Sequence, residues 1–370
     1  MQVGAVDAGL NNLEASTFLR HFQSMMGPYG LYQHATIREP LLSEGYCTDD
    51  NARAVQLLAR LLPLALPNDR EIVRALLMDC WKFLVEARIR PGYFYNFRDS
   101  GGQWLPHGQS EDMYARLIRA LAAVLNNQGL VDLHAEAAAM LKPILVRAPD
   151  MQAPRFWAEC LVVLADFPDE IMPVHIVKSL VDIGQGILAD AWEKHSTPDW
   201  RWFEDTMTYA NALLPHGLLA TSGHNDILRD SARFLIETTV QDDMFVPVGS
   251  VGWYPKGGAP SHDNQQAIEA GTMFDFLLAY NANRQASVSS AVVAAPYLWF
   301  FGRNTNSAVM ADRATGACLD GLFLEGPNPN YGAESMLAYL WTELLLRDAS
   351  QDIKDYIRTQ MGHLSHRRGQ

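Results

Sequence analysis

Acidic and amide residues gather at five places where a helix is expected to begin. Residues 45–53 are GYCTDDNAR, 109–116 are QSEDMYAR, 200–205 are WRWFED, 261–266 are SHDNQQ and 328–335 are NPNYGAES. Helix capping explains one short polar side chain at such a place, and Thr48, Ser110 and Ser261 are predicted caps. Capping does not explain several acids followed by an arginine. Paired carboxylates at one opening can act as general acid and general base.

Four of these acids are the candidate catalytic residues. We expect Asp50 or Asp112 to act as the acid and Glu334 or Asp263 to act as the base. Arg53 follows Asp50 by three residues and would share its helix face, where it can hold a carboxylate ionised. In a crowded ring of acids, mutual repulsion raises the pKa of some carboxyl groups and leaves that of others low. Acid–base chemistry requires one group of each kind.

Aromatic residues lie in the segments that lead to the same helix starts. Flat aromatic rings stack on sugar faces, and carboxylates and amides bind sugar hydroxyls, although loop packing also uses such rings. The segment from Tyr93 to Trp104 alternates and has Gly101-Gly102, which predicts a β-hairpin. The predicted substrate-binding residues are Tyr46, Asp49, Asn51, Arg53, Tyr95, Trp104, Glu111, Trp202, Asp205, Trp253, His262, Gln266 and Asn330.

The elements that would position these residues are helices. Apolar periodicity and breakers predict twelve main helices near 13–25, 49–65, 69–89, 110–127, 131–147, 152–166, 173–192, 204–222, 225–240, 262–281, 285–302 and 332–348, with a short one near 351–364. Links after even-numbered helices are mostly short, and links before them mostly long. This alternation predicts six helical hairpins closed into an (α/α)6 toroid, with the even helices inside and short β-hairpins in the long loops of one rim. An open α-solenoid is the alternative, but no repeated motif supports it.

Composition narrows the function classes. The chain has 370 residues and a net charge of −13, which disfavours binding to nucleic acid through its phosphates. No apolar run is long enough to span a bilayer, and no signal peptide is evident at the N-terminus. No phosphate loop, GxSxG elbow or zinc-ligand spacing is present. We therefore expect one domain over 1–370, in the cytoplasm, with a carbohydrate substrate and neither metal nor cofactor; the oligomeric state is left open.

Two of the acidic segments also resemble a known family. The pattern GYCxDDNARA near the start and NxNxGAES near the end are similar to those of a bacterial six-hairpin glycosidase-like family. Tyr331 stands where that family pattern has glutamine. The resemblance implies an (α/α)6 toroid over about residues 30 to 345 and a possible glycosyltransferase partner, since such domains often accompany glycosyltransferases.

Three functions follow as hypotheses. The leading one is a glycoside hydrolase that cleaves an oligo- or polysaccharide with two carboxylates, with inversion. A sugar epimerase would use His216 or His262 as a base, and a glycuronyl hydrolase or lyase would need Arg53, Arg98 or Lys256 to meet the substrate carboxylate. The third is a glycan-binding module without catalysis.

Overall fold

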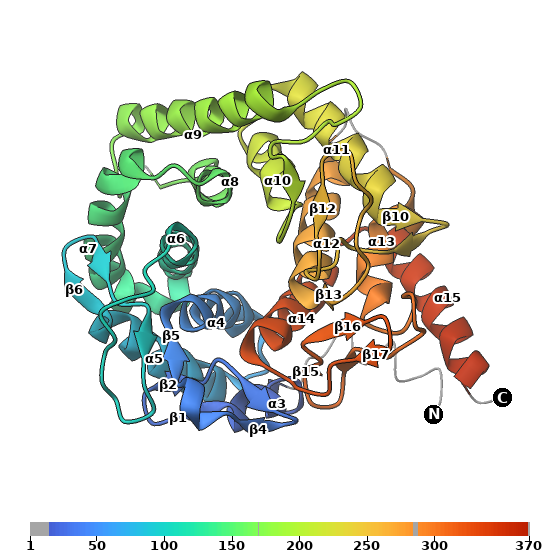
Figure 1. Ribbon diagram of the computed structural model, residues 1–370. Helices are drawn as coiled ribbons and strands as arrows, with labels where there is room; N and C mark the ends of the chain where they lie inside the picture. Colours follow the sequence, from blue (N-terminus) through green and yellow to red (C-terminus); the bar gives the residue numbers. More distant parts are fainter. Residues whose placement is uncertain (1–14, 169, 284–287, 369–370) are drawn as a thin grey trace.

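The computed structural model describes residues 15–168, 170–283 and 288–368. Its helices form two concentric circles (Figure 1). The inner circle consists of α4 (Thr48–Leu61), α6 (Glu111–Leu125), α8 (Pro154–Leu164), α10 (Leu213–Ala220), α12 (Ala267–Ala282) and α14 (Ala333–Leu346). The outer circle consists of α5 (Arg70–Glu86), α7 (Val131–Arg147), α9 (Val174–His195), α11 (Asn225–Thr239), α13 (Ser290–Trp299) and α15 (Gln351–Arg368). Each inner helix contacts the next, and α14 contacts α4, so the inner circle is closed.

The predicted (α/α)6 toroid is therefore confirmed, with one change in how its hairpins are counted. The last hairpin consists of α14 and α15, so the helix predicted near 351–364 is a full outer helix. The first predicted helix, 13–25, forms only the short α2 (Ala15–Phe18) and α3 (Arg20–Ser24), and its first two residues lie outside the described ranges. These two short helices precede the six hairpins.

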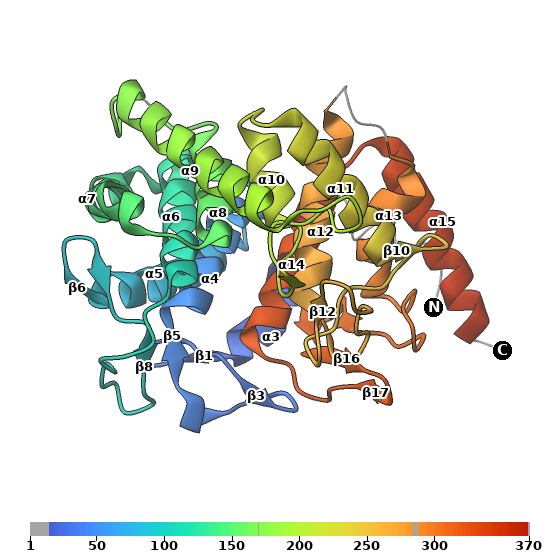
Figure 2. The ribbon, with the colours of Figure 1, turned by 45° about the horizontal axis from the view of Figure 1, so that its top comes forward.

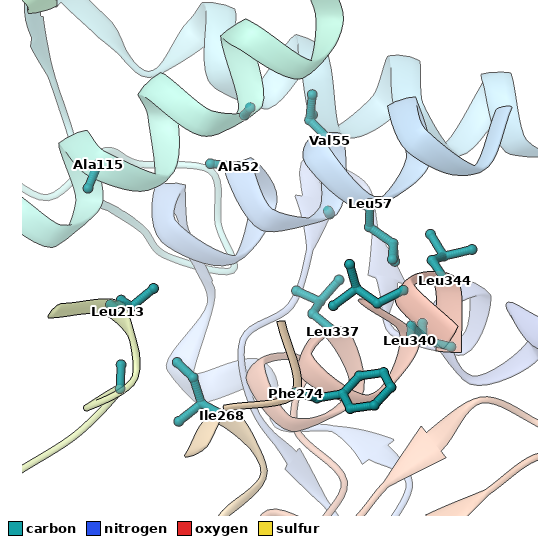
Figure 3. Close-up of a cluster of buried hydrophobic side chains, with 14 of the residues drawn as sticks. Ala52, Val55, Leu57, Ala115, Leu213, Ile268, Phe274, Leu337, Leu340 and Leu344 are labelled. Atoms are coloured by element: carbon teal, nitrogen blue, oxygen red, sulfur yellow. The ribbon is translucent and has the colours of Figure 1, made fainter. Parts of the chain in front are cut away.

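Buried apolar side chains hold neighbouring inner helices together. Figure 3 shows Ala52 and Val55 of α4, Ala115 of α6, and Leu337 and Leu340 of α14. Apart from Leu337, which is 3 % exposed, these side chains are completely buried. The small alanine side chains suit close helix packing, and the larger side chains fill the remaining space.

Short antiparallel strand pairs occupy the long loops, several at one end of the ring (Figure 2). The strands are β1 (Met26–Gly27), β2 (Gly30–Leu31), β3 (Ala35–Thr36), β4 (Glu39–Pro40), β5 (Tyr46–Cys47), β6 (Arg88–Arg90), β7 (Tyr93–Phe94), β8 (Phe97–Arg98), β9 (Thr206–Met207), β10 (Val240–Gln241), β11 (Met244–Phe245), β12 (Tyr254–Pro255), β13 (Gln265–Gln266), β14 (Ala311–Asp312), β15 (Ala317–Cys318), β16 (Gly321–Phe323) and β17 (Gly326–Pro327). The expected hairpin at 93–104 is divided: β7 pairs with β6, while β8 pairs with β5 and Arg98 bridges to Trp104.

Two inner helices begin five or more residues later than predicted. Residues 204–212 were expected to be helical, but α10 starts only at Leu213. Ala210 has a φ of 46°, and its amide donates a hydrogen bond to Glu269, so the chain turns there before the helix begins. Similarly, α12 starts at Ala267 because β13 pairs with β16. Residues 262–266, which were predicted to be helical, therefore form a loop and β13.

Candidate functional site

Two adjoining cavities open among the N-termini of the inner helices. The Asp50 cavity contains about 320 Å³ of water-accessible space and is lined by Gln33, His34, Cys47, Asp49, Asp50, Arg53, Asn96, Phe97, Gln266, Asp320, Gly332, Glu334 and Ser335. The Asp112 cavity contains about 260 Å³ of water-accessible space and is lined by Asp49, Arg53, Asp112, Arg116, Tyr209, Ser250, Trp253, Gln266, Ile268 and Glu334. Asp49, Arg53, Gln266 and Glu334 belong to both cavities, so the two form one site.

Arg53 joins three carboxylates at the centre of this site. Its Nη1 lies 2.8 Å from Glu334 and 3.1 Å from Asp50, and its Nε lies 3.3 Å from Asp49. Because Asp50 and Glu334 contact the same nitrogen, their nearest oxygens are at most about 6 Å apart. The helices α4 and α14 thereby bring together two acids that are far apart in the sequence.

The Asp50 side chain is buried and has few hydrogen-bond donors around it. Its side chain is 8 % exposed. Burial raises its pKa to about 6, and the nearby charges of Asp49 and Glu334 act in the same direction against the opposing effect of Arg53. The Cys47 thiol donates to Asp50 Oδ2 at 3.1 Å, and its sulfur accepts the Asp50 amide at 3.4 Å. Asp50 therefore holds its proton more strongly than an ordinary aspartic acid does.

The other carboxylate, Asp112, is bound by a tyrosine from across the ring. The Tyr209 hydroxyl donates to Asp112 Oδ2. Arg155 holds Tyr209 in two ways: its Nε donates to the Tyr209 carbonyl at 2.7 Å, and its guanidinium lies 4.5 Å from the ring centre. Burial raises the pKa of the Tyr209 hydroxyl, and the bond to Asp112 raises it further. Tyr209 is thus a neutral donor at the cavity wall.

A buried glutamate fixes the backbone that carries Tyr209. Glu269, in the first turn of α12, accepts hydrogen bonds from the amides of Ala210 and Asn211 and from the Asn211 side chain. Burial raises its pKa to about 7, and these three donors oppose that rise. Glu269 does not line either cavity. Its contacts explain why the segment before α10 forms a turn.

Arginines connect the site to the interior of the ring. Arg116 pairs with Glu159 of α8 and lies 3.7 Å from Asp49. Arg119, one turn further along α6, lies 3.6 Å from Glu159 and 3.6 Å from Asp275. Burial lowers the pKa of both arginines, to about 10 for Arg116. These pairs place charge in the centre of the ring beyond Arg53.

Seven of the predicted site residues line the cavities. They are Asp49, Asp50, Arg53, Asp112, Trp253, Gln266 and Glu334. They come from α4, α6, α14 and the loops before α12, as the ring arrangement predicted. Of these, Trp253 is the only predicted aromatic residue that lines either cavity in the described part of the chain.

Four predicted polar residues instead form hydrogen bonds to backbone groups of other segments. Asn51 is completely buried and binds the backbone of Leu31, and Asn330 accepts the Ile37 amide. Other bonds bind Glu111 to the amides of Gln152 and Ala153, and Asp263 to the Leu324 amide. The structure therefore does not bring Asp263 to the other candidate catalytic acids.

The remaining predicted residues lie outside the two cavities. Tyr46 and Trp202 are completely buried in the core, where no sugar can reach them. Tyr95 stacks on Trp104 at 5.6 Å between ring centres. Asp205 pairs with His195, and His262 is half-buried in the loop before β13.

The structure adds residues that sequence reasoning did not select. His34, Cys47, Asp320 and Ser335 line the Asp50 cavity, and Tyr209 and Ser250 line the Asp112 cavity. Cys47 is also the cap of α4, whereas the predicted cap Thr48 donates to the Tyr95 carbonyl. Ser110 caps α6 as predicted, but Ser261 lies before a helix that starts at Ala267. Proximity to the acidic segments was the available signal for Cys47 and Ser335.

The described ranges contain no group of three or more His, Cys, Asp or Glu residues that could hold a metal ion. No helix within them is long and apolar enough to cross a bilayer.

Comparison with known proteins identifies the fold. No known protein family and no curated protein matches the sequence. Among solved structures, cellobiose 2-epimerase from Bacillus thermoamylovorans is similar with a TM-score of 0.67 at 12% identity, over 93% of this chain and 99% of that one. Cellobiose 2-epimerase from Spirochaeta thermophila is similar at 0.66 and 14%, over 96% and 97%. A GH76 alpha-mannanase from Bacteroides thetaiotaomicron is similar at 0.61 and 8%, over 94% and 96%. The likeness shows a shared (α/α)6 toroid.

Proposed function

We propose that the protein is a glycoside hydrolase that cleaves an oligo- or polysaccharide with Asp50 as general acid and Glu334 as general base. The observation that carries this proposal is their meeting at one nitrogen of Arg53. Asp50 is buried and has a pKa of about 6, so it can deliver a proton to the leaving oxygen. The Glu334 side chain is 44% exposed and can reach a water molecule.

The reaction then proceeds by the two-carboxylate route. The glycosidic bond breaks as Asp50 protonates its oxygen, and water activated by Glu334 attacks the sugar from the opposite face. Attack by water in a single displacement would invert the anomeric configuration, and inverting pairs have their carboxyl groups about 6.5–9.5 Å apart. The nearest oxygens of Asp50 and Glu334 are at most about 6 Å apart. The anomer formed first therefore decides between inversion and retention. Asp112, presented by Tyr209, would bind a sugar hydroxyl beside this centre, and Trp253 would face the ring of the sugar.

Substitution of each acid tests the proposal. Wild-type protein is screened against neutral and uronate-containing oligosaccharides, and the anomer formed first is identified by NMR. We expect Asp50→Asn and Glu334→Gln each to lose about 100-fold or more in kcat. Asp205→Asn, at an exposed acid outside both cavities, is the matched control and should keep its turnover. Full activity in both active-site variants would exclude the mechanism.

A sugar epimerase is the second candidate. His34 lines the same cavity as Glu334, and an imidazole is a suitable base for removing a proton from a sugar carbon. Epimerisation in deuterium oxide would place deuterium on that carbon, whereas hydrolysis would not. Sugar binding without either reaction would identify a glycan-binding module.

The glycosyltransferase partner and the cytoplasmic location inferred from the sequence remain proposals. Co-purification with a glycosyltransferase and cell fractionation would test them.

A further inference from the structure

The ring contains a third cavity beside the two that form the candidate site. This axial cavity contains about 80 Å³ of water-accessible space and has walls from all six inner helices. Leu57, Leu213 and Leu337 supply apolar surface, and Gln56, Thr272 and Asp275 supply polar groups. Figure 3 shows how Leu57, Leu213 and Leu337 come from three different inner helices. A mixed lining of this kind suits a sugar, which has apolar faces and polar edges.

The axial cavity adjoins the proposed catalytic centre. Arg53, Arg116, Ile268 and Glu334 line both it and the Asp112 cavity. A ligand that reaches Glu334 from the mouth therefore has space ahead of it along the ring axis.

An ion pair crosses the ring at the deeper level of this cavity. Arg119 belongs to α6 and Asp275 to α12, which lie opposite each other in the inner circle (Figure 1). Their 3.6 Å contact therefore spans the bore. Trp341 of α14 donates to the same Asp275 oxygen at 3.2 Å. Arg119 and Trp341 each follow a mouth acid, Asp112 or Glu334, by seven residues, which is a depth of about 10 Å.

The charges around these cavities disfavour an anionic ligand. Seven carboxyl groups but only three guanidinium groups line the three cavities within the described ranges. Arg53 contacts Asp49, Asp50 and Glu334, while Arg116 and Arg119 share Glu159. Each arginine is thus already neutralised. A uronate, sulfate or phosphate on the sugar would add negative charge without gaining an unpaired cation.

We propose that the axial cavity is the subsite for the terminal unit of an uncharged glycan. It therefore makes the enzyme act at chain ends. The blocked bore stops a longer chain from passing through, and the acid excess selects sugars without charge. The assignment to chain-end hydrolysis rests on the proposed function, whereas the binding of a neutral sugar in the axial cavity does not.

A cavity-filling variant tests the subsite. Ala338→Leu adds bulk to the cavity wall, and Ala279→Leu adds the same bulk on α12 outside the cavities as a matched control. Both variants are first compared with wild type by circular dichroism and thermal unfolding. Binding of D-glucose, D-mannose and D-glucuronate is then measured by saturation-transfer NMR. We expect a neutral sugar to bind wild type and Ala279→Leu, at least tenfold weaker binding to Ala338→Leu, and at least tenfold weaker binding of glucuronate.

Turnover is followed separately with gluco- and mannohexaose labelled at the reducing end. Shortening by one unit at a time is expected, and fragments from mid-chain cleavage would overturn the chain-end proposal while leaving the hydrolase intact. Neutral-sugar binding that Ala338→Leu weakens, without any hydrolysis, would support the subsite and refute the hydrolase. The subsite itself is overturned if no neutral sugar binds, if Ala338→Leu binds like wild type, or if glucuronate binds equally well. Should Ala338→Leu fail to fold, the glucuronate comparison on wild type still decides the charge selectivity.

Discussion

Replacing Asp50 by asparagine removes an ionisable proton while nearly keeping the shape of the side chain. The Asp50 side chain is 8% exposed, and burial together with Asp49 and Glu334 raises its pKa from 3.8 to about 6. The folded protein therefore binds this proton more tightly than the unfolded chain does. Its stabilising contribution is fully present below about pH 4 and is lost as the pH rises through about 6. The neutral amide of asparagine has no such loss.

The size of the effect follows from the two pKa values. The difference between 3.8 and about 6 corresponds to about 3 kcal/mol of unfolding free energy. Arg53 retains Asp49 and Glu334 as partners in the Asp50→Asn variant, so no buried cation is left unpaired. We thus expect the variant to gain up to about 3 kcal/mol relative to wild type between pH 4 and pH 8, although it is inactive.

Urea unfolding followed by circular dichroism at several pH values between 4 and 8 measures this difference. Asp190→Asn, at an exposed position of α9, gives the baseline for removing an ordinary carboxylate. If the unfolding free energies of wild type and Asp50→Asn changed in parallel with pH after this baseline is subtracted, ionised Asp50 would not destabilise the folded protein. That result would refute the prediction. A wild-type protein that gained stability relative to the variant as the pH rose would refute it as well.

Three further substitutions test neighbouring contacts. Tyr209→Phe removes the donor to Asp112 and should lower kcat/KM by about 10- to 100-fold with little change in Tm, since hydrogen bonds to charged groups contribute about 1.5–3 kcal/mol; unchanged kinetics would contradict the role given to Tyr209. Cys47→Ala removes a hydrogen bond that lowers the pKa of Asp50, so the alkaline limb of the activity profile should move to higher pH, whereas Cys47→Ser should keep it near the wild-type position. Glu269→Ala leaves two backbone amides without their acceptor and should reduce the unfolding free energy by about 3 kcal/mol, measured by urea titration, and a loss below about 1 kcal/mol would show that water replaces the carboxylate.

The local sequence was sufficient to predict most of the helices and the end of the ring that carries the site. Apolar periodicity, breakers and link lengths are properties of neighbouring residues, so α4, α6, α7 and α11 were predicted within a few residues. The acidic segments before α4 and α14 could likewise be recognised in the sequence, because their residues stand together. The closed ring orients these N-termini toward one opening.

Contacts between distant segments decided the rest. Asn330 binds the amide of Ile37, 293 residues away, and this bond takes it out of the candidate site. Glu269 turns the segment before α10 into a loop and thereby presents Tyr209, although the local pattern favoured a helix. Trp202 lies in a loop rich in aromatic residues, yet it is completely buried.

The physical reason for this division is the range of the interactions. Helix formation depends on residues three or four positions apart, so the sequence alone determined the helices, their hairpins and the acid-rich ends of α4 and α14. The direction of a loop side chain depends on which other loop meets it after the ring closes. Only the tertiary structure could therefore decide that Asp50 and Glu334 share Arg53, that Asp263 is elsewhere, and that the bore is crossed by Arg119 and Asp275.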